Sequence, residues 1–368
     1  MAGENQVMNP IGISRLGAVN VTGADKDALF LKVFSGEVLQ VFEENNALLP
    51  LVRQRTISSG KSAQFPVTGV ATAKYHTPGE SIMASGTDGS SPADGVLDTS
   101  KYLTQMKHTE RVISIDGMLV SSAFIGDIDE AKNHYDVRSA YSTQIGRELA
   151  YHADRALIRT CIAGARKTTD RFGGSDAKFL GAQVALDTDS PADGVQGDEI
   201  VTGLFTVAQK MDEASVPADG RHCILSPANY YKLVNTASDS VLRAINRDFG
   251  NEGNGSIARG EIVQVAGIRI LKSNHIPTAN ESSSQDAVFG DDLINNDVFV
   301  GDGGYSGANF TATEGICFQT EGLGTVKLLD LAMESEYQLD RLGTLMVAKY
   351  AMGHGILREE CLFELTTA

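Results

Sequence analysis

The sequence predicts an α+β fold in which strands from the C-terminal part of the chain pack against one long helix. Apolar residues recur at every fourth position within residues 127–166, as on the buried face of a helix. Two β-prone runs lie between residues 56 and 117, and long strand-like segments fill residues 325–367. This mixture of one long helical segment and several strands places the chain in the α+β class.

The composition is that of a folded protein with a sizeable core. The 368 residues are 42% hydrophobic and 21% charged, which is normal for one large or two medium domains. No stretch approaches the roughly 20 apolar residues that a membrane helix needs, and the first residues lack a signal-peptide pattern. We therefore expect no membrane partner and a cytosol-like compartment.

The chain is acidic, with 47 Asp and Glu residues against 31 Lys and Arg residues and a formal net charge of −16. A general nucleic-acid-binding protein needs Lys and Arg side chains that neutralise phosphates, so the charge argues against that class. The four cysteines are far apart and form no C-x-x-C pair. We therefore expect buried free thiols, and neither a disulfide framework nor a compact zinc motif.

The N-terminal part divides into a polar arm and a helix. Residues 1–24 are small and polar without a sustained period, so we expect an arm that is ordered only where something holds it. Residues 25–43 carry apolar side chains at helical spacing, including an aromatic-rich stripe. The pair Ser35-Gly36 is expected to weaken or interrupt this helix.

A long two-stranded hairpin follows. Residues 57–75 are β-prone, and Arg111–Gly117 alternate between two faces. The connecting segment, residues 83–100, is rich in Gly, Ser and Asp, which favour turns. Because an isolated hairpin is barely stable in water, we expect it to lie on something else, such as another subunit.

The strongest helical pattern follows the hairpin. Tyr141, Ile145, Leu149, Ala153, Leu157 and Cys161 recur every four positions, and Gly164 is a suitable C-terminal end. Residues 134–163 alone would span about 45 Å at 1.5 Å per residue. A helix of this length would serve as the spine of its domain.

A second unit begins after a Gly- and Ser-rich link over residues 173–197. Its predicted elements are a helix over 198–214, a strand over 222–226, a helix that begins at Ser226-Pro227, and two strands or one bulged strand over 261–273. The C-terminal strands then return to the spine helix. The middle of the chain is therefore predicted to be an insertion, with the first and last portions in one domain.

No catalytic, cofactor-binding or metal-binding residue stands out. Gly60-Lys61-Ser62 resembles the second half of a phosphate-binding loop, but Arg55 stands where the first glycine should be. Pro66 shortly afterwards prevents the helix that such a loop requires. The seven histidines form no known metal motif, and no G-x-S-x-G sequence occurs. We therefore predict no enzyme activity and no cofactor, and a turn at Ser58–Gly60 that presents Lys61 outward.

Five segments resemble the major capsid protein of T7-like short-tailed bacteriophages (podoviruses). They are LFLKVFSGEVL at 29–39, ISSGKSAQFPV at 57–67, KHTERVISIDG at 107–117, NHYDVRS at 133–139 and VAKYAMGHG at 347–355. They keep the order of the family, whereas residues 167–320 match it only loosely. The order of parts derived above agrees with the order that this resemblance implies.

The resemblance implies the HK97-type shell fold. It assigns residues 1–56 to an N-terminal arm, 57–110 to an extended loop, 111–197 and 321–368 to a peripheral domain with the spine helix, and 198–320 to an inserted axial domain. The loop tip, residues 84–99, is longer than expected for the family. We hypothesise that this tip makes an extra contact on the shell exterior.

The implied function is structural. Such a protein self-assembles into hexamers and pentamers of an icosahedral capsid around double-stranded DNA, without sequence-specific binding to the DNA. The implied partners are a scaffolding protein during assembly and a portal protein at one vertex. The implied location is the virion capsid, assembled in the host cytoplasm. The acidic balance suits a DNA container, because a basic inner wall would oppose packing and release.

Candidate contacts between subunits lie at the base of the extended loop. Charged side chains there could set the register between neighbours, and two aromatic side chains could act as apolar anchors. The charged candidates are Lys61, Lys107, His108, Glu110 and Arg111, and the aromatic candidates are Phe65 and Tyr75. Two alternatives stay open at this point, namely a nucleotide-hydrolysing enzyme and a cellular shell of the same fold that encloses enzymes.

Overall fold

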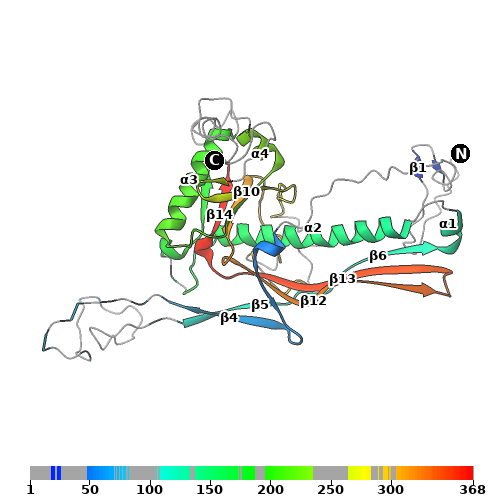
Figure 1. Ribbon diagram of the computed structural model, residues 1–368, viewed down its shortest axis with the longest axis horizontal. Helices are drawn as coiled ribbons and strands as arrows, with labels where there is room; N and C mark the ends of the chain where they lie inside the picture. Colours follow the sequence, from blue (N-terminus) through cyan, green and yellow to red (C-terminus); the bar gives the residue numbers. More distant parts are fainter. Residues whose placement is uncertain are drawn as a thin grey trace, which may run out of the picture.

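The computed structural model has an α+β architecture built on one long helix and two main sheets (Figure 1). The structure describes residues 18–20, 23–25, 48–69, 108–132, 137–172, 174, 176–186, 195–234, 264–282, 289, 293–296, 298–299 and 304–367, with single positions 71, 73, 75, 76, 78, 79, 82 and 106. The helix predicted from residue 25 to 43 and the loop tip at 84–99 lie outside these residues, apart from Asp25.

The predicted spine helix is confirmed as α2, Val137–Ala165, preceded by the short helix α1, Asp127–Lys132. Its buried face follows the predicted four-residue step, since Leu149, Ala153, Leu157 and Cys161 are all buried. Figure 1 shows α2 running along the long axis of the molecule above the longest strands. The helix therefore supplies one continuous apolar surface on which other elements pack.

A four-stranded sheet lies along the N-terminal half of α2. Its order is β3 (Arg53–Thr56), β12 (Leu323–Gln338), β13 (Gly343–Ile356) and β6 (Leu119–Gly126), with β3 parallel to β12 and the other pairs antiparallel. Ile145, Leu149 and Ala153 of α2 pack on β13 side chains such as Met346 and Ala348. The long C-terminal strands thus return to the spine helix, as predicted.

A six-stranded sheet lies at the other end of α2. Its order is β7 (Ala182–Ala185), β14 (Leu362–Thr366), β11 (Thr313–Gln319), β8 (Arg221–Leu225), β10 (Ile268–Lys272) and β9 (Gln264–Val265). The helices α3 (Gly197–Glu213) and α4 (Pro227–Val234) contribute to its core, where Leu204 and Met211 are fully buried with Cys223 and Leu365. A second core joins Leu157 and Cys161 of α2 to β11.

Several predicted elements of this second unit are confirmed. The helix over 198–214, the strand over 222–226 and the helix beginning at Pro227 match α3, β8 and α4. Two alternatives were predicted for residues 261–273, and the alternative of two strands is confirmed. Ala266 and Gly267 form a tight turn between β9 and β10, with positive φ angles of 51° and 77°. All four cysteines are buried and free.

The six-stranded sheet draws strands from both sides of the predicted domain boundaries. β8 to β11 come from the range predicted to be axial, whereas β7 and β14 come from ranges predicted to be peripheral. The division of the chain into four parts stays a prediction.

The remaining short elements are the hairpin of β1 (Ala18–Asn20) and β2 (Gly23–Asp25) and the 3-10 turns η1 (Leu49–Leu51), η2 (Ala177–Phe179) and η4 (Glu359–Cys361).

Candidate functional site: the hairpin and its attachment

The predicted hairpin is formed by β4 (Ser62–Thr68) and β5 (His108–Ser114), which pair antiparallel with Phe65 opposite Arg111. Figure 1 shows it extending from the body at the end opposite the β12–β13 tip. Within the described residues, neither strand pairs with any further strand. The hairpin is therefore a projecting two-stranded arm whose base alone is attached to the body.

The inner face of the hairpin base packs on its own chain. Ala63 and Phe65 of β4 and Ile113 of β5 are buried together with Val326 and Leu357. Burying each large apolar side chain stabilises the subunit by about 1.5–3 kcal/mol. The base is thus held by a small hydrophobic core within the subunit.

Phe65 packs inside its own subunit, and its role as an intersubunit anchor stays a prediction. Only 8% of its surface is exposed, and the Arg55 guanidinium lies 5.7 Å from its ring centroid. Alternation along β4 directs this side chain toward the body, so the packing of its own chain accounts for its burial.

Arg111 also makes its principal contact inside the subunit. Its guanidinium pairs with the fully buried carboxylate of Glu359, which lies 3.4 Å from Lys167 Nζ as well. A buried carboxylate requires such partners, because unpaired burial of a charge is costly. The pair fastens β5 to η4 of the same chain.

Other predicted contact residues are open to a second molecule. Lys61, His108 and Glu110 are exposed, and Tyr75 is fully exposed. Lys107 lies outside the described residues. The roles of these residues between subunits stay predictions.

Gly60 and Lys61 form the turn that opens the hairpin and do not form a phosphate loop. Gly60 has a φ angle of 116°, a conformation that side chains strongly disfavour. The Lys61 carbonyl accepts a hydrogen bond from Ile115 N at 2.8 Å, and β4 begins directly at Ser62. A strand rather than a helix therefore follows the Gly-Lys-Ser sequence, as predicted.

A glycine in β13 allows the close approach of the hairpin base. A Cβ atom at Gly353 would lie 1.8 Å from the Ser114 carbonyl oxygen, a distance that no real contact permits. This close approach explains why glycine occupies position 353 in VAKYAMGHG, one of the segments that resemble the phage family.

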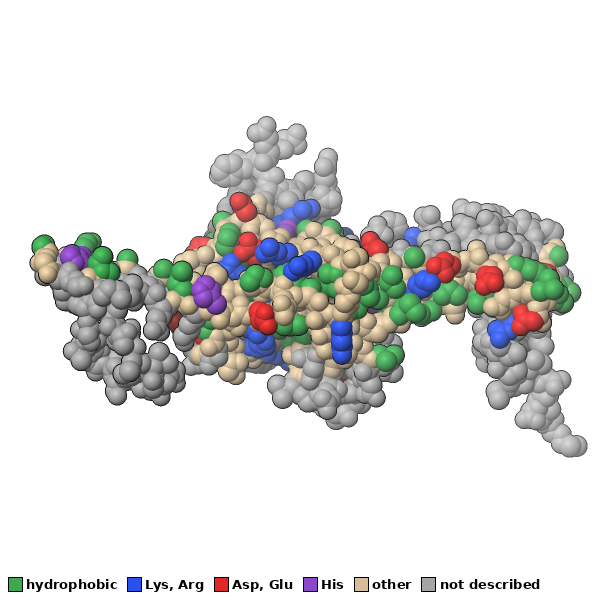
Figure 2. Space-filling model, turned by 90° about the horizontal axis from the view of Figure 1, so that it is seen from below, with side chains coloured by type: hydrophobic (Ala, Val, Ile, Leu, Met, Phe, Trp, Pro, Cys, Tyr) green, Lys and Arg blue, Asp and Glu red, His purple; other side chains and the backbone are tan. Residues whose placement is uncertain are grey.

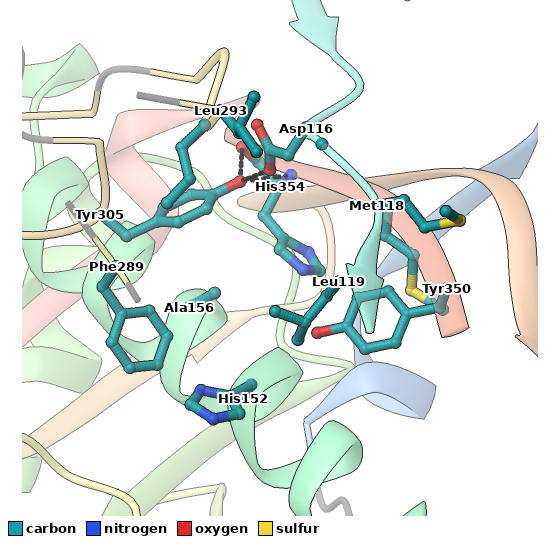
Figure 3. Close-up of a pocket in the computed structure, with 13 residues that line it drawn as sticks. Asp116, Met118, Leu119, His152, Ala156, Phe289, Leu293, Tyr305, Tyr350 and His354 are labelled. Atoms are coloured by element: carbon teal, nitrogen blue, oxygen red, sulfur yellow. Dashed lines mark hydrogen bonds between the residues drawn. The ribbon is translucent and has the colours of Figure 1, made fainter. Parts of the chain in front are cut away.

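A polar cluster that no sequence pattern predicted is centred on Asp116, which lies between β5 and β6 (Figure 3). The Asp116 carboxylate accepts hydrogen bonds from Asn295 N at 2.8 Å, Asn296 Nδ2 at 2.9 Å and Tyr305 Oη at 2.6 Å. Tyr305 Oη also accepts from His354 N at 2.9 Å. The cluster joins the hairpin base, the 293–305 segment and β13.

Burial governs the electrostatics of this cluster. Desolvation raises the pKa of Asp116 to about 6, although the hydrogen bonds from Tyr305 and the two asparagines act in the opposite direction. Burial lowers the pKa of His354 to about 4, and its Nδ1 lies 3.0 Å from Thr325 Oγ1. Figure 3 shows His152 and Phe289 facing the same hollow from the other side.

Two ion pairs attach the spine helix to the rest of the subunit. Buried Arg159 lies 2.5 Å from Glu281 and its guanidinium lies 4.0 Å from the Phe289 ring centroid. Arg166 binds Glu364 of β14 through two hydrogen bonds of 2.7 and 2.6 Å.

Among the described residues, no group of three or more His, Cys, Asp and Glu side chains could hold a metal ion. No helix in the described part of the chain is long and apolar enough to cross a membrane.

Comparison with known proteins decides the family. Residues 64–366 match the model of the Gp10A-like major capsid proteins. The chain belongs to this family. It is 32% identical to the major capsid protein of Escherichia phage T7, over 92% of both chains. It is 33% identical to that of Enterobacteria phage T3, over 92% of this chain and 91% of the other.

A solved capsid structure agrees with this assignment. The structure of the cyanophage P-SCSP1u capsid aligns with a TM-score of 0.70 and 40% identity, covering 96% of this chain and 98% of the other. A Gp10A-like major capsid protein is a structural component of a phage capsid shell and not an enzyme. The alternative of a nucleotide-hydrolysing enzyme is therefore excluded.

Proposed function

We propose that this major capsid protein has the HK97-type fold and self-assembles into hexamers and pentamers of an icosahedral shell that encloses double-stranded DNA. In this proposal residues 1–56 form the N-terminal arm, 57–110 the extended loop, and 198–320 most of the axial domain. The peripheral domain comprises 111–197 and 321–368, with β7 and β14 completing the axial sheet.

The projecting hairpin is the observation that carries the proposal. Beyond its base, the described residues of its own chain provide no core for it, as the full exposure of Tyr75 illustrates. A two-stranded arm is marginal by itself, so contact with a neighbouring subunit is its most favourable environment. Closed shells require the same chain to make such head-to-tail contacts in rings.

The charge supports DNA as the enclosed molecule without specific binding. The net charge of −16 on each chain opposes tight overall binding of DNA phosphates. We further propose a scaffolding protein and a portal protein as assembly partners, and assembly in the host cytoplasm before the protein resides in the virion.

Expression in bacteria followed by negative-stain electron microscopy tests this proposal. With a scaffolding protein from the same phage, we expect closed icosahedral particles, with rings of five and six subunits resolved by subsequent cryo-electron microscopy. Particles that form alone around protein cargo would favour the cellular shell instead. A folded subunit that stays monomeric under both conditions would contradict both.

A further inference from the structure

A hollow lies where the hairpin base, the spine helix, β13 and the segments around Phe289 and Tyr305 meet (Figure 3). Its volume is about 190 Å³. An apolar cavity of about 150 Å³ holds one benzene molecule, so this hollow has room for a single substituted ring. Most of its lining is apolar, and Ala156, Phe289, Tyr305 and Met352 of that lining are buried.

Two polar side chains of β13 point into this hollow. Figure 3 shows the His354 ring and the Tyr350 hydroxyl directed toward it, and only 3% and 8% of these residues is exposed. His354 Nδ1 lies 3.0 Å from Thr325 Oγ1, which leaves Nε2 for another partner. Within the described part of the chain, neither His354 Nε2 nor Tyr350 Oη has a hydrogen-bond partner. Because buried polar groups are normally paired, both atoms indicate a place for a bound molecule.

Burial fixes the protonation of both groups near neutral pH. The pKa of His354 is lowered to about 4, so its imidazole is uncharged. Burial raises the pKa of Tyr350 well above its usual value, so its hydroxyl keeps the proton and can donate it to a hydrogen bond. The hollow therefore offers uncharged hydrogen-bonding groups to a molecule inside it.

The charges around the hollow disfavour an ionised occupant. The face drawn in Figure 2 carries charged side chains of both signs, whereas the described lining of the hollow contains one acid, Asp116, and no Lys or Arg. The Asp116 carboxylate already accepts several hydrogen bonds and would repel an anion. The guanidinium groups of Arg155 and Arg159, which lie 5.1 and 4.0 Å from the Phe289 ring centroid, would repel a cation.

We propose that this hollow is a binding site for a small uncharged aromatic molecule that carries a hydroxyl group, as a phenol does. The ring packs against Phe289, Tyr305 and Met352, and the hydroxyl supplies the partner that Tyr350 Oη and His354 Nε2 lack. Because the lining belongs to one chain, the inference does not depend on the proposed assembly. It goes beyond it, since a molecule bound here joins the hairpin base to the spine helix and stabilises the folded subunit.

Binding of four probes to the purified full-length subunit tests the inference. Toluene, para-cresol, benzylamine and benzoate are similar in size and differ in the hydroxyl group and in charge. Isothermal titration calorimetry at neutral pH should show that para-cresol binds about two- to tenfold more tightly than toluene, the effect of one net hydrogen bond. Charged benzylamine and benzoate should bind at least about tenfold more weakly than para-cresol. Equally tight binding of a charged probe would contradict the proposed class of ligand.

Three variants locate the site. Ala156 lines the hollow from α2, so Ala156→Leu should abolish binding of para-cresol and keep or raise the melting temperature of the unliganded subunit. Tyr350→Phe keeps the ring and removes the hydroxyl, and should reduce the preference for para-cresol over toluene. The matched control is Tyr337→Phe, because the Tyr337 hydroxyl lies outside the hollow and donates to Asp127 at 2.7 Å. This control should keep the preference of the wild type.

Each outcome supports or overturns the inference. A wild-type subunit that bound none of the probes would overturn it and leave the proposed shell function untouched. Equal binding of para-cresol by the wild type and Ala156→Leu would place the probe elsewhere, which also overturns it. If Ala156→Leu did not fold, an unchanged preference for para-cresol in Tyr350→Phe would still refute the site. Subunits that bind para-cresol as expected but never form particles would contradict the proposed function alone.

Discussion

At the scale of single residues, the subunit depends on buried charges that are paired across distant parts of the chain. Arg159 with Glu281 and Arg166 with Glu364 connect the spine helix to a loop and to β14. Asp116 connects the hairpin base to the 293–305 segment. Each of these groups is costly to bury alone, so removing one partner should cost more than the pair contributes.

The Arg159–Glu281 pair yields a stability prediction. Arg159→Met leaves the Glu281 carboxylate buried without its cation, although Ser306 Oγ still donates to it at 2.7 Å. We expect the free energy of unfolding to fall by about 3–5 kcal/mol. The double variant Arg159→Met with Glu281→Leu should lose less. Urea denaturation of the unassembled subunit measures both.

The control for this prediction is the exposed pair of Lys349 and Glu334, whose side-chain atoms are 2.9 Å apart. Lys349→Met should change the free energy of unfolding by less than about 1 kcal/mol. If Arg159→Met lowered the free energy of unfolding no more than Lys349→Met does, the buried pair would not be required for stability.

The shifted pKa values of Asp116 and His354 predict opposite dependences of stability on pH. The pKa of Asp116 is raised to about 6, so the folded subunit binds more protons than the unfolded chain between about pH 4 and 6. This stabilising contribution is fully present below pH 4 and is lost as the pH rises through 6. The stability of the wild type relative to Asp116→Asn should therefore decrease over that range, as urea denaturation at stepped pH would measure.

His354 should behave in the reverse sense. Its pKa is lowered to about 4, so its contribution is present above pH 6.5 and is lost as the pH falls toward 4. The stability of the wild type relative to His354→Gln should decrease on acidification. Parallel curves for wild type and variant in either series would contradict the corresponding pKa shift.

At the scale of elements, the hairpin is anchored at its base and free along its outer part. The anchoring uses a small apolar core, the Arg111–Glu359 pair and the glycine that lets β5 approach β13. A base held in this way sets the direction in which β4 and β5 leave the body.

Substitutions of Phe65 and Tyr75 should distinguish the anchored base of the hairpin from its outer part. Phe65→Ala removes a buried ring and should lower the free energy of unfolding of the isolated subunit by about 3–5 kcal/mol. Tyr75→Ala removes a fully exposed ring and should leave it unchanged. Differential scanning fluorimetry of unassembled subunits compares them. An unchanged melting temperature for Phe65→Ala would mean that the ring serves a neighbour rather than its own chain.

Two glycine substitutions should change the stability of the subunit in opposite directions. Gly353→Ala places a methyl group against the Ser114 carbonyl and should destabilise the subunit, because the backbone of β5 or β13 must shift. Gly146→Ala lies in α2 with no atom within 4 Å of the new Cβ, and should stabilise it by about 0.5–1 kcal/mol. Equal melting temperatures for the two variants would contradict the tight contact at Gly353.

At the scale of the whole molecule, the elements that share a core are separate from the hairpin that we propose for assembly. The two sheets and α2 share their cores, whereas the hairpin extends away from them (Figure 1). We therefore expect the subunit to be stable before it assembles.

Shortening the arm tests this division. Replacing residues 70–106 with an Asn-Gly turn keeps β4, β5 and the buried base of the hairpin. We expect an unchanged melting temperature for the isolated subunit and no closed particles in negative-stain images. Normal particles from the shortened chain would show that the outer arm is dispensable for the shell.

Local sequence patterns were enough to predict the spine helix, the hairpin, α3, β8, α4 and an interruption of the strand region at Gly267. In each of these elements, the residues that reveal the pattern are close in sequence and face the same core. The spacing of Leu149, Ala153 and Leu157, for example, required no knowledge of their partners. The five segments that resemble the phage family likewise needed only the order of residues.

Tertiary structure alone decided which side of the hairpin faces its own body and which groups meet there. Asp116 and Tyr305 are 189 positions apart, and Arg111 and Glu359 are 248 apart. No local pattern encodes such pairs, because their energies depend on burial and on a geometry that exists only after the sheets have formed. The sequence by itself therefore determined the elements and the family, whereas the attachment of the arm was decided by long-range packing.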